Sequence, residues 1–203
     1  DDLASPWLLT SPDGAGARLD LTTLRGVRVG EHPALSLRRG VMTGLNDAFV
    51  DRSPLAHDAR KALRPLLRGG DVGAWRAKPS SALLWTHDDE VAAPLMRPPG
   101  AVVEALVPHA EGLRQRTGLH RQDAWWRIFR TGPHLFGPKV VWRDIGRRLE
   151  AAAVPATAAL EGEERALIPL NTVYFMPVAC ESQALVLAAW LNSAPVRRFA
   201  DAL

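Results

Sequence analysis

Two short stretches of this chain combine residue types that can bind phosphates or nucleobases. Residues 40–50 read GVMTGLNDAFV, in which two glycines flank a threonine and an asparagine follows. Glycines at this spacing let the backbone adopt positive φ and approach a ligand closely. Residues 64–76 read RPLLRGGDVGAWR, which places Arg68, Trp75 and Arg76 around three glycines. Backbone N–H groups and guanidinium groups in such a loop can reach a phosphate or a base edge. The alternative is an ordinary turn in which Arg68 pairs with Asp71.

A third stretch alternates aromatic and basic residues. Residues 125–130 read WWRIFR, and residues 138–145 read PKVVWRDI. Residues 111–150 hold nine basic and four acidic residues, whereas the whole chain has a net charge of only +3. Aromatic rings can stack on bases while arginines contact the nucleic-acid backbone. We expect Trp126 and Trp142 to fill the core. We expect a nucleic-acid face formed by Arg127, Arg130, Lys139 and Arg143.

The composition indicates a folded domain without disulfides. The chain has 203 residues, of which 47% are hydrophobic, as is usual for a globular core. Cys180 is the only cysteine, which excludes an intrachain disulfide and fits a reducing cytoplasm. No apolar run approaches the ~20 residues of a membrane span, and no signal peptide opens the chain. We therefore expect a cytoplasmic protein without a membrane partner. Because the chain does not begin with methionine, we interpret it as an excised domain of a longer protein.

The residues that could catalyse a reaction or bind a metal are scattered. Residues 87–90 read HDDE, but no further ligands stand at the required spacing, so we interpret them as a solvated turn. The remaining histidines lack the spacing of a zinc site. The serines lack nucleophile-elbow surroundings, and no strand–GxGxxG–helix unit is present. We expect no catalytic residue, no bound metal and no cofactor in this chain, and hence no enzyme activity of its own.

The order of expected elements mixes strands and helices without a βαβ rhythm. We expect a linker at residues 1–25, with an apolar anchor at 7–9, and a domain at residues 26–203. If the domain has two lobes, their boundary is expected near 118–123. Residues 45–50 are expected to form a turn that leads into a strand. Further strands are expected at residues 27–29, 82–86, 140–142, 151–154 and 166–178. Helices are expected at residues 57–63, from 98 to 106, around Leu113, at 183–191 and from Pro195. This order predicts an α+β fold.

Taken together, these stretches resemble the TaqI-like C-terminal specificity domain of N6-adenine DNA methyltransferases. The matching segments follow the family's order, and they read GVMTGLNDAFV at 40–50, PLLRGGDV at 65–72, WR at 75–76, WWRIFR at 125–130, PKVV at 138–141 and LNS at 191–193. Gly70 stands where a second charged residue is usual in the family. Such domains occur in stand-alone type II methyltransferases and in fused type IIG restriction–modification enzymes.

The resemblance implies a target recognition domain that reads double-stranded DNA. In such enzymes a separate N-terminal domain binds S-adenosylmethionine and transfers a methyl group to adenine N6 (EC 2.1.1.72). That catalytic domain would be the protein partner of this chain. The resemblance places Arg68, Trp75 and Arg76 near base edges or phosphates. It assigns contacts with the DNA backbone to Arg127, Arg130, Lys139 and Arg143. It also implies a loop at the DNA or at the domain junction, formed by Thr43, Gly44 and Asn46.

Two other classes of function remain open from the sequence. The chain could be a protein-interaction or docking module, in which the tryptophans and arginines are interface hot spots. It could also be a metal-dependent nuclease, which needs clustered carboxylates and has only Asp88, Asp89 and Glu90 to offer. Binding that does not depend on salt would favour the first alternative, and metal-dependent DNA cleavage would favour the second.

Overall fold

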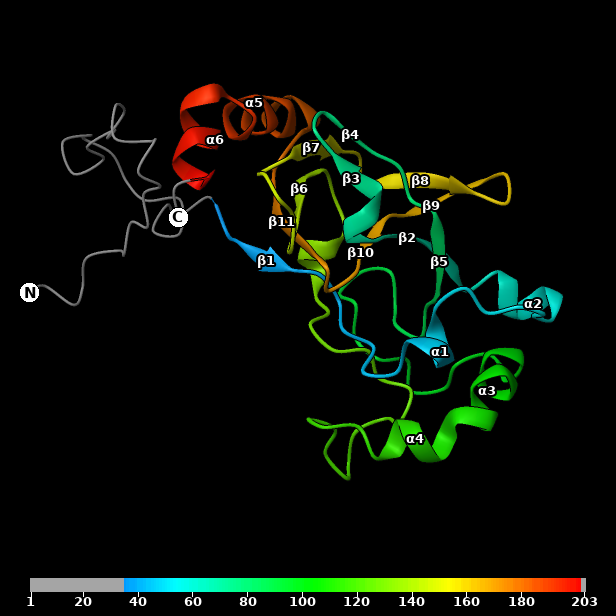
Figure 1. Cartoon of the computed structure of the whole chain (residues 1–203). Coiled ribbons are helices and arrows are strands. Elements are labelled where there is room, and N and C mark those ends of the chain that lie inside the picture. Colours follow the sequence, from blue (N-terminus) through cyan, green and yellow to red (C-terminus); the bar gives the residue numbers. More distant parts are fainter. Residues whose placement is uncertain (1–34, 202–203) are drawn as a thin grey trace, which may run out of the picture.

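Short strands and helices are mixed along the chain in an α+β arrangement (Figure 1). The structure is a computed structural model that describes residues 35–201. The α+β fold expected from the sequence is confirmed. The expected linker at residues 1–25, with its anchor at 7–9, and the expected strand at 27–29 lie outside the described residues.

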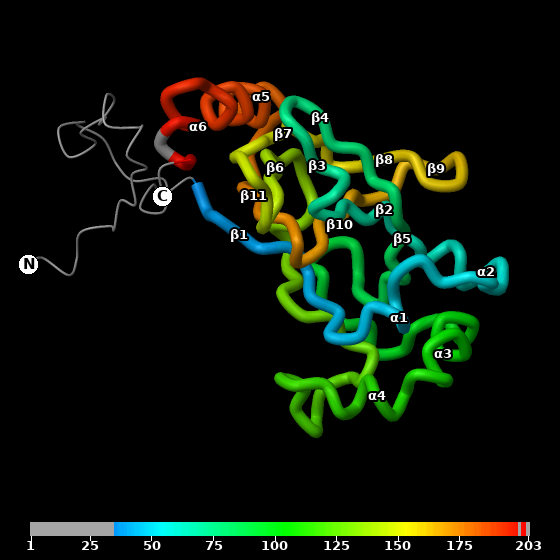
Figure 2. The backbone as a smooth tube through the Cα atoms, viewed as in Figure 1, coloured from blue at the N-terminus to red at the C-terminus, as the bar shows by residue number. Residues whose placement is uncertain are grey.

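The largest sheet is antiparallel and carries the C-terminal helices. Its strand order is β1–β11–β6–β7, formed by β1 (Arg38–Arg39), β11 (Val173–Pro177), β6 (Lys139–Arg143) and β7 (Ala151–Val154). Helix α5 (Glu181–Leu191) packs on β6 and β7, and α6 (Ala194–Asp201) follows it, as the tube in Figure 2 shows. Because side chains alternate along a strand, Val140 and Met176 meet α5, whereas Val141 and Phe175 face the main core.

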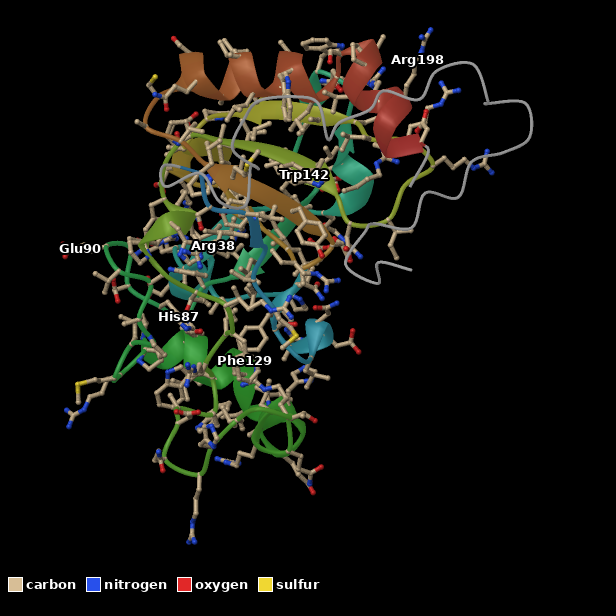
Figure 3. The ribbon with its side chains drawn as sticks, turned by 90° about the vertical axis from the view of Figure 1, so that its left-hand side faces the viewer. Arg38, His87, Glu90, Phe129, Trp142 and Arg198 are labelled. Atoms are coloured by element: carbon tan, nitrogen blue, oxygen red, sulfur yellow. The ribbon has the colours of Figure 1, made fainter. Side chains whose placement is uncertain are left out.

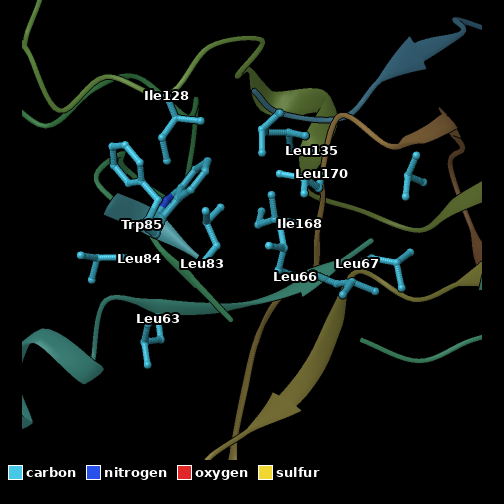
Figure 4. Close-up of a cluster of buried hydrophobic side chains, with 14 of the residues drawn as sticks. Leu63, Leu66, Leu67, Leu83, Leu84, Trp85, Ile128, Leu135, Ile168 and Leu170 are labelled. Atoms are coloured by element: carbon cyan, nitrogen blue, oxygen red, sulfur yellow. The ribbon is translucent and has the colours of Figure 1, made fainter. Parts of the chain in front are cut away.

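A second sheet crosses the centre of the molecule and supplies much of the main core. Its order is β10–β2–β5, formed by β10 (Ile168–Pro169), β2 (Leu63–Leu67) and β5 (Ser81–Leu84). Strand β2 pairs in parallel with β10 and antiparallel with β5. Leucines of these strands are buried, and Figure 4 shows them packed beside Trp85, Ile128 and Leu135.

Two hairpins and a set of short helices surround these sheets. The hairpins are β3 (Val72–Gly73) with β4 (Arg76–Ala77) and β8 (Thr157–Leu160) with β9 (Glu163–Ala166). The helices before β6 are α1 (Asn46–Phe49), α2 (His57–Arg60), α3 (Gly100–Leu106), α4 (Ala110–Arg114) and the 3-10 turns η4 (Gly69–Asp71), η5 (Val107–His109) and η6 (Pro133–Leu135). Helices α3 and α4 form the end of the molecule opposite α5 and α6 (Figure 1).

Several expected elements are confirmed. Strands form at β5, β6 and β7, and helices form at α3, α4, α5 and α6, close to the predicted residues. Pro99 stands at the N-cap of α3, and the chain turns into η5 at Pro108, because proline has no N–H to continue an α-helix.

Three expectations were wrong in detail. Residues 46–49 form helix α1 rather than a turn into a strand, because Ala48 and Phe49 bury their side chains on one side of a single helical turn. The helix expected to reach residue 63 ends at Arg60, and residues 63–67 form the buried strand β2. The strand expected at 166–178 is interrupted at residues 171–172, where the chain turns from β10 into β11.

The segment where a lobe boundary was expected, residues 118–123, lies in an irregular stretch between α4 and β6. Leu113 before this stretch and Ile128 after it belong to the same buried cluster. That cluster also contains Val141 and Phe175 of the large sheet. The described residues on the two sides of the stretch therefore share one core.

Candidate nucleic-acid interface

The residues predicted to bind DNA gather in two places. The first, which we call the junction cluster, contains Thr43, Gly44, Asn46, Arg127 and Arg130 around a bridge between Met42 and Phe129. The second, which we call the hairpin cluster, contains Arg68, Trp75, Arg76 and Arg143 around the β3–β4 hairpin and the loop at residues 144–150. Figure 3 shows Phe129 of the junction cluster in the lower half and Trp142, the sequence neighbour of Arg143, beside the upper sheet.

A buried arginine holds the junction cluster together. Arg116 is 7% exposed and donates hydrogen bonds to three carbonyls, from Nε to Leu113 at 2.9 Å, from Nη2 to Trp125 at 2.7 Å and from Nη1 to Thr43. Its guanidinium lies 5.0 Å from the centroid of the Phe129 ring. Burial lowers the pKa of Arg116 to about 10, so the group stays charged at neutral pH.

The loop at residues 43–46 is shaped to fit around this arginine. Gly44 has φ +69, and a Cβ atom at this position would lie 2.8 Å from Cδ of Arg116. The Thr43 side chain is buried, and its hydroxyl donates to Oδ1 of Asn46 at 2.6 Å. Asn46 itself is exposed at the start of α1. The Thr43 carbonyl and hydroxyl are therefore used inside the protein, and only Gly44 and Asn46 face solvent.

The two other arginines of the junction cluster differ in their surroundings. Arg127 pairs with Asp123, four residues earlier in sequence, at 3.0 Å. Arg130 is exposed, has φ +59, and makes no ion pair with any residue of the described range 35–201. The structure thus leaves Arg130 more available to a phosphate than Arg127.

In the hairpin cluster, the RGGD turn at residues 68–71 is closed by its own aspartate. Asp71 Oδ2 accepts a hydrogen bond from the backbone N–H of Arg68 at 2.7 Å, and the Asp71 N–H donates to the Arg68 carbonyl at 3.0 Å. Asp71 thus bonds the backbone of Arg68, and the two side chains form no ion pair with each other. The Arg68 guanidinium is half exposed and lies 3.9 Å from the carboxylate of Asp51.

The tip of the β3–β4 hairpin presents an aromatic ring and a guanidinium. Trp75 is 62% exposed and has φ +70, a conformation that is unfavourable for a bulky side chain. Its backbone N–H donates to the Ala151 carbonyl at 2.9 Å, which fixes the hairpin against β7. Arg76 follows and is exposed. Trp75 and Arg76 therefore project from a fixed tip.

The arginine at the end of β6 ties the hairpin to the large sheet. Arg143 Nη2 donates to the Val72 carbonyl and to Glu150 Oε2, the latter at 2.9 Å. Its side chain is 30% exposed. Arg143 therefore contributes to the shape of this surface as well as to its charge.

Lys139 was expected to contact the DNA backbone, and this was wrong. Its side chain is 0% exposed, at the start of β6, and Nζ lies 3.5 Å from the Leu167 carbonyl. Burial lowers the pKa of Lys139 from 10.5 to about 8, because the charged form loses its hydration. A buried ammonium cannot reach a phosphate at the surface.

Both tryptophans that were expected in the core pack against it without being fully buried. Trp126 contacts the main cluster, and its Nε1 donates to the Leu95 carbonyl at 2.9 Å. Trp142 packs against the cluster below α5 and stacks on Tyr174 with ring centroids 6.2 Å apart.

The HDDE stretch does not form a metal centre in the described part of the chain. His87 is buried and burial lowers its pKa to about 4, while the Asp88 carboxylate accepts hydrogen bonds from the N–H groups of Glu90, Val91 and Ala93. Figure 3 shows His87 inside the fold and Glu90 at its edge. Among residues 35–201, no group of three His, Cys, Asp or Glu side chains could hold a metal ion.

A cavity of about 530 Å³ opens beside His87, with Trp85 and Pro99 in its lining. Its two cations are already neutralised, because Lys61 pairs with Asp58 at 2.7 Å and Arg64 pairs with Asp89 at 2.5 Å. This cavity therefore offers no free positive charge to a phosphate.

Sequence reasoning missed three arginines that the structure makes prominent. Arg116 is the buried centre of the junction cluster. Arg147 and Arg148 are exposed in the loop between β6 and β7. Their signal was an Arg-Arg pair directly after a glycine, between two predicted strands, which places them at a hairpin loop.

Comparison with known proteins does not assign the chain to a family. No protein-family model matches the chain, and no curated protein matches it. Of the helices within residues 35–201, none is both long and apolar enough to cross a membrane.

Proposed function

We propose that this chain is a DNA target recognition domain of a larger adenine-N6 DNA methyltransferase. One observation carries the proposal: two sequence-distant motifs meet at the hairpin cluster. The Gly69 N–H donates to the Thr172 hydroxyl at 2.9 Å, and the Asp144 N–H donates to the Thr172 carbonyl at 2.9 Å. The RGGD turn and the loop at residues 144–150 therefore lie against the same strand connection.

This surface has the chemistry that duplex DNA requires. Arg68 and Arg76 offer guanidinium groups, which suit guanine edges and phosphates, and Trp75 offers a ring face for stacking. Arg130 adds a further exposed guanidinium in the junction cluster. We assign base reading to Arg68 or Arg76, and phosphate contacts to Arg130 and to whichever of Arg68 and Arg76 does not read a base. Methyl transfer, with S-adenosylmethionine, would belong to a catalytic domain that is not part of this chain, and this chain would hold the duplex for it.

The test is binding of a fluorescent duplex across a salt series from about 50 to 200 mM, followed by anisotropy. We expect affinity to fall steeply with salt, because each neutralised phosphate releases counterions. Replacing Arg68 or Arg76 with alanine should then relax sequence preference at one position and cost about 1–3 kcal/mol of binding free energy. No binding even at the lowest salt would contradict the proposal.

A second candidate function, docking to another protein domain, is favoured by helix α5. This helix buries Ala184 and Ala188 on the sheet but exposes Leu185 (61%), Val186 (68%) and Trp190 (48%). Val186 and Trp190 stand four residues apart and therefore lie on the same outer face of the helix, and Leu185 borders that face. Such a face is typical of an interface. It is compatible with DNA recognition if the partner is the catalytic domain.

If α5 is a docking surface, mutations in it should weaken binding of a protein domain without changing DNA binding at the hairpin cluster. The double variant L185S/W190S should weaken binding of the catalytic domain, supplied as a separate chain and followed by calorimetry, by tenfold or more. It should leave the salt dependence of DNA binding unchanged. Unchanged affinity for the catalytic domain would exclude α5 as the docking face.

A further inference from the structure

The loop between β6 and β7 presents two arginines that no side chain in the described part of the chain neutralises. Arg147 and Arg148 are exposed, and neither makes an ion pair or a side-chain hydrogen bond with any residue in the range 35–201. By contrast, both acidic residues next to them are engaged. Asp144 is paired with Arg39, and Glu150 is paired with Arg143 at 2.9 Å. The positive charge of Arg147 and Arg148 is therefore left for a ligand.

The loop is braced at both of its ends. Arg39 donates to Asp144 and, through Nε, to the Asn171 carbonyl at 2.8 Å. Arg197 on α6 donates from Nε to the Leu149 carbonyl at 3.1 Å. Arg39 and Arg197 thus hold the two ends of the loop, which lowers the entropy that the loop would lose on binding a ligand.

Gly146 allows Arg143 to pass beneath the loop. A Cβ atom at residue 146 would lie 2.5 Å from Cδ and 2.9 Å from Cγ of Arg143. Arg143 Nε is buried and has no hydrogen-bond partner among the described residues. A cavity of about 520 Å³ opens here, and its lining consists of Arg143, Gly146, Arg147, Arg148 and Glu150.

We propose that this cavity is an anion site that takes a phosphodiester of the DNA backbone. Guanidinium groups bind phosphate oxygens with short, charge-assisted and often bidentate hydrogen bonds. Arg147 and Arg148 supply these donors. Arg143 pairs with Glu150 and forms part of the lining of the cavity. This site would make the contact with the DNA backbone that was predicted for Lys139. The assignment to DNA rests on the proposed function, whereas the affinity for a phosphate group does not.

The test compares the salt dependence of duplex binding between variants. Loss of two phosphate contacts should lower the slope of log Kobs against log salt by about 1.8, because each contact contributes about 0.9. The loss of affinity between 50 and 200 mM salt should thus shrink about tenfold for R147A/R148A. The variant R147K/R148K should retain most of the slope, because it keeps the charges. The matched control is R97A/R121A, which removes two exposed arginines elsewhere and should keep the wild-type slope.

Two outcomes separate failure of the site from failure of the proposed function. If the wild-type chain binds DNA and R147A/R148A keeps its slope, the site is wrong and the function stands. If the wild-type chain does not bind DNA, the function is wrong, and inorganic pyrophosphate is used as the probe. Shifts of the Arg147 and Arg148 Nε–H signals on adding pyrophosphate, absent in the Gly146→Ala variant, would then support the anion site. No shift would overturn it.

Discussion

The junction cluster and the hairpin cluster both lie among glycines and arginines, but the arginine at the centre of the first is buried, whereas the two arginines beside the second are exposed. In the junction cluster, Arg116 is buried and its N–H groups are taken by backbone carbonyls. In the loop at residues 144–150 beside the hairpin cluster, Arg147 and Arg148 face solvent, while the acidic residues of that loop pair with other arginines. An arginine surrounded by carbonyls holds a fold together, whereas an arginine surrounded by water can meet a ligand.

The same contrast applies to the glycines. Gly40 lies so close to the chain after β10 that a Cβ atom would stand 2.2 Å from the Leu170 carbonyl oxygen. Gly70, in the RGGD turn, has no atom within 4 Å of such a Cβ. The glycine-rich stretch at 40–50 therefore serves close packing. In the turn at 68–71, Gly69 packs against Thr172, and only Gly70 lies in open space.

The largest effect is expected from Arg116→Ala. The change leaves the carbonyls of Leu113, Thr43 and Trp125 without their donor, and each buried unsatisfied group is costly. We expect the free energy of unfolding to fall by about 3 kcal/mol or more in urea denaturation. Arg147→Ala is the control and should change stability by less than about 0.5 kcal/mol. Equal effects of the two changes would remove the distinction between the clusters.

The next largest difference is expected between alanine substitutions at Gly40, which is closely packed, and at Gly70, which is not. Gly40→Ala forces a methyl group against the backbone of Leu170 and Pro169, and we expect a loss of about 2–3 kcal/mol in stability. Gly70→Ala meets no neighbour and should stay within about 0.5 kcal/mol of the wild-type chain. Thermal melts of both variants measure the difference, and a large loss for Gly70→Ala would show that the turn is packed.

The variant Lys139→Met tests whether the Lys139 ammonium is buried at the start of β6. Because burial lowers the pKa of Lys139 from 10.5 to about 8, the unfolded chain binds more protons between these pH values. The stability of the wild-type chain should therefore rise with pH across that window, relative to the variant. At pH 7 the methionine variant should be more stable by about 3 kcal/mol, and the gap should shrink towards pH 10. A pH-independent gap would mean that Lys139 is not buried as a charge.

The smallest difference concerns the two arginines of the junction cluster that were predicted to contact phosphates. Arg130 makes no ion pair within residues 35–201, whereas Arg127 is paired with Asp123 at 3.0 Å. Arg130→Ala should lower the salt slope of DNA binding by about 0.9, and Arg127→Ala should lower it less. An equal slope change for the two variants would show that the ion pair with Asp123 opens on binding.

How far the sequence predicts this structure depends on the range of the interactions. Strands such as β7 and helices such as α5 follow from local apolar patterns, and the proline positions predict where α3 begins. Strand β2 was missed because Pro65 and its flanking arginines suggested a loop, while the partners that bury its leucines, β5 and β10, are distant in sequence. The burial of Lys139 and Arg116 could not be predicted, because both depend on which segments pack around them.

The most direct test of the central claim is to observe the arginine side chains while DNA is added. Nitrogen-labelled arginine would report the Nε–H signals of Arg68, Arg116, Arg147 and Arg148 during titration with a short duplex at low salt. We predict progressive shifts for Arg68, Arg147 and Arg148 and none for Arg116. Shifts centred on Arg116 and the loop at residues 43–46, with Arg147 and Arg148 unchanged, would contradict the assignment of DNA binding to the hairpin cluster.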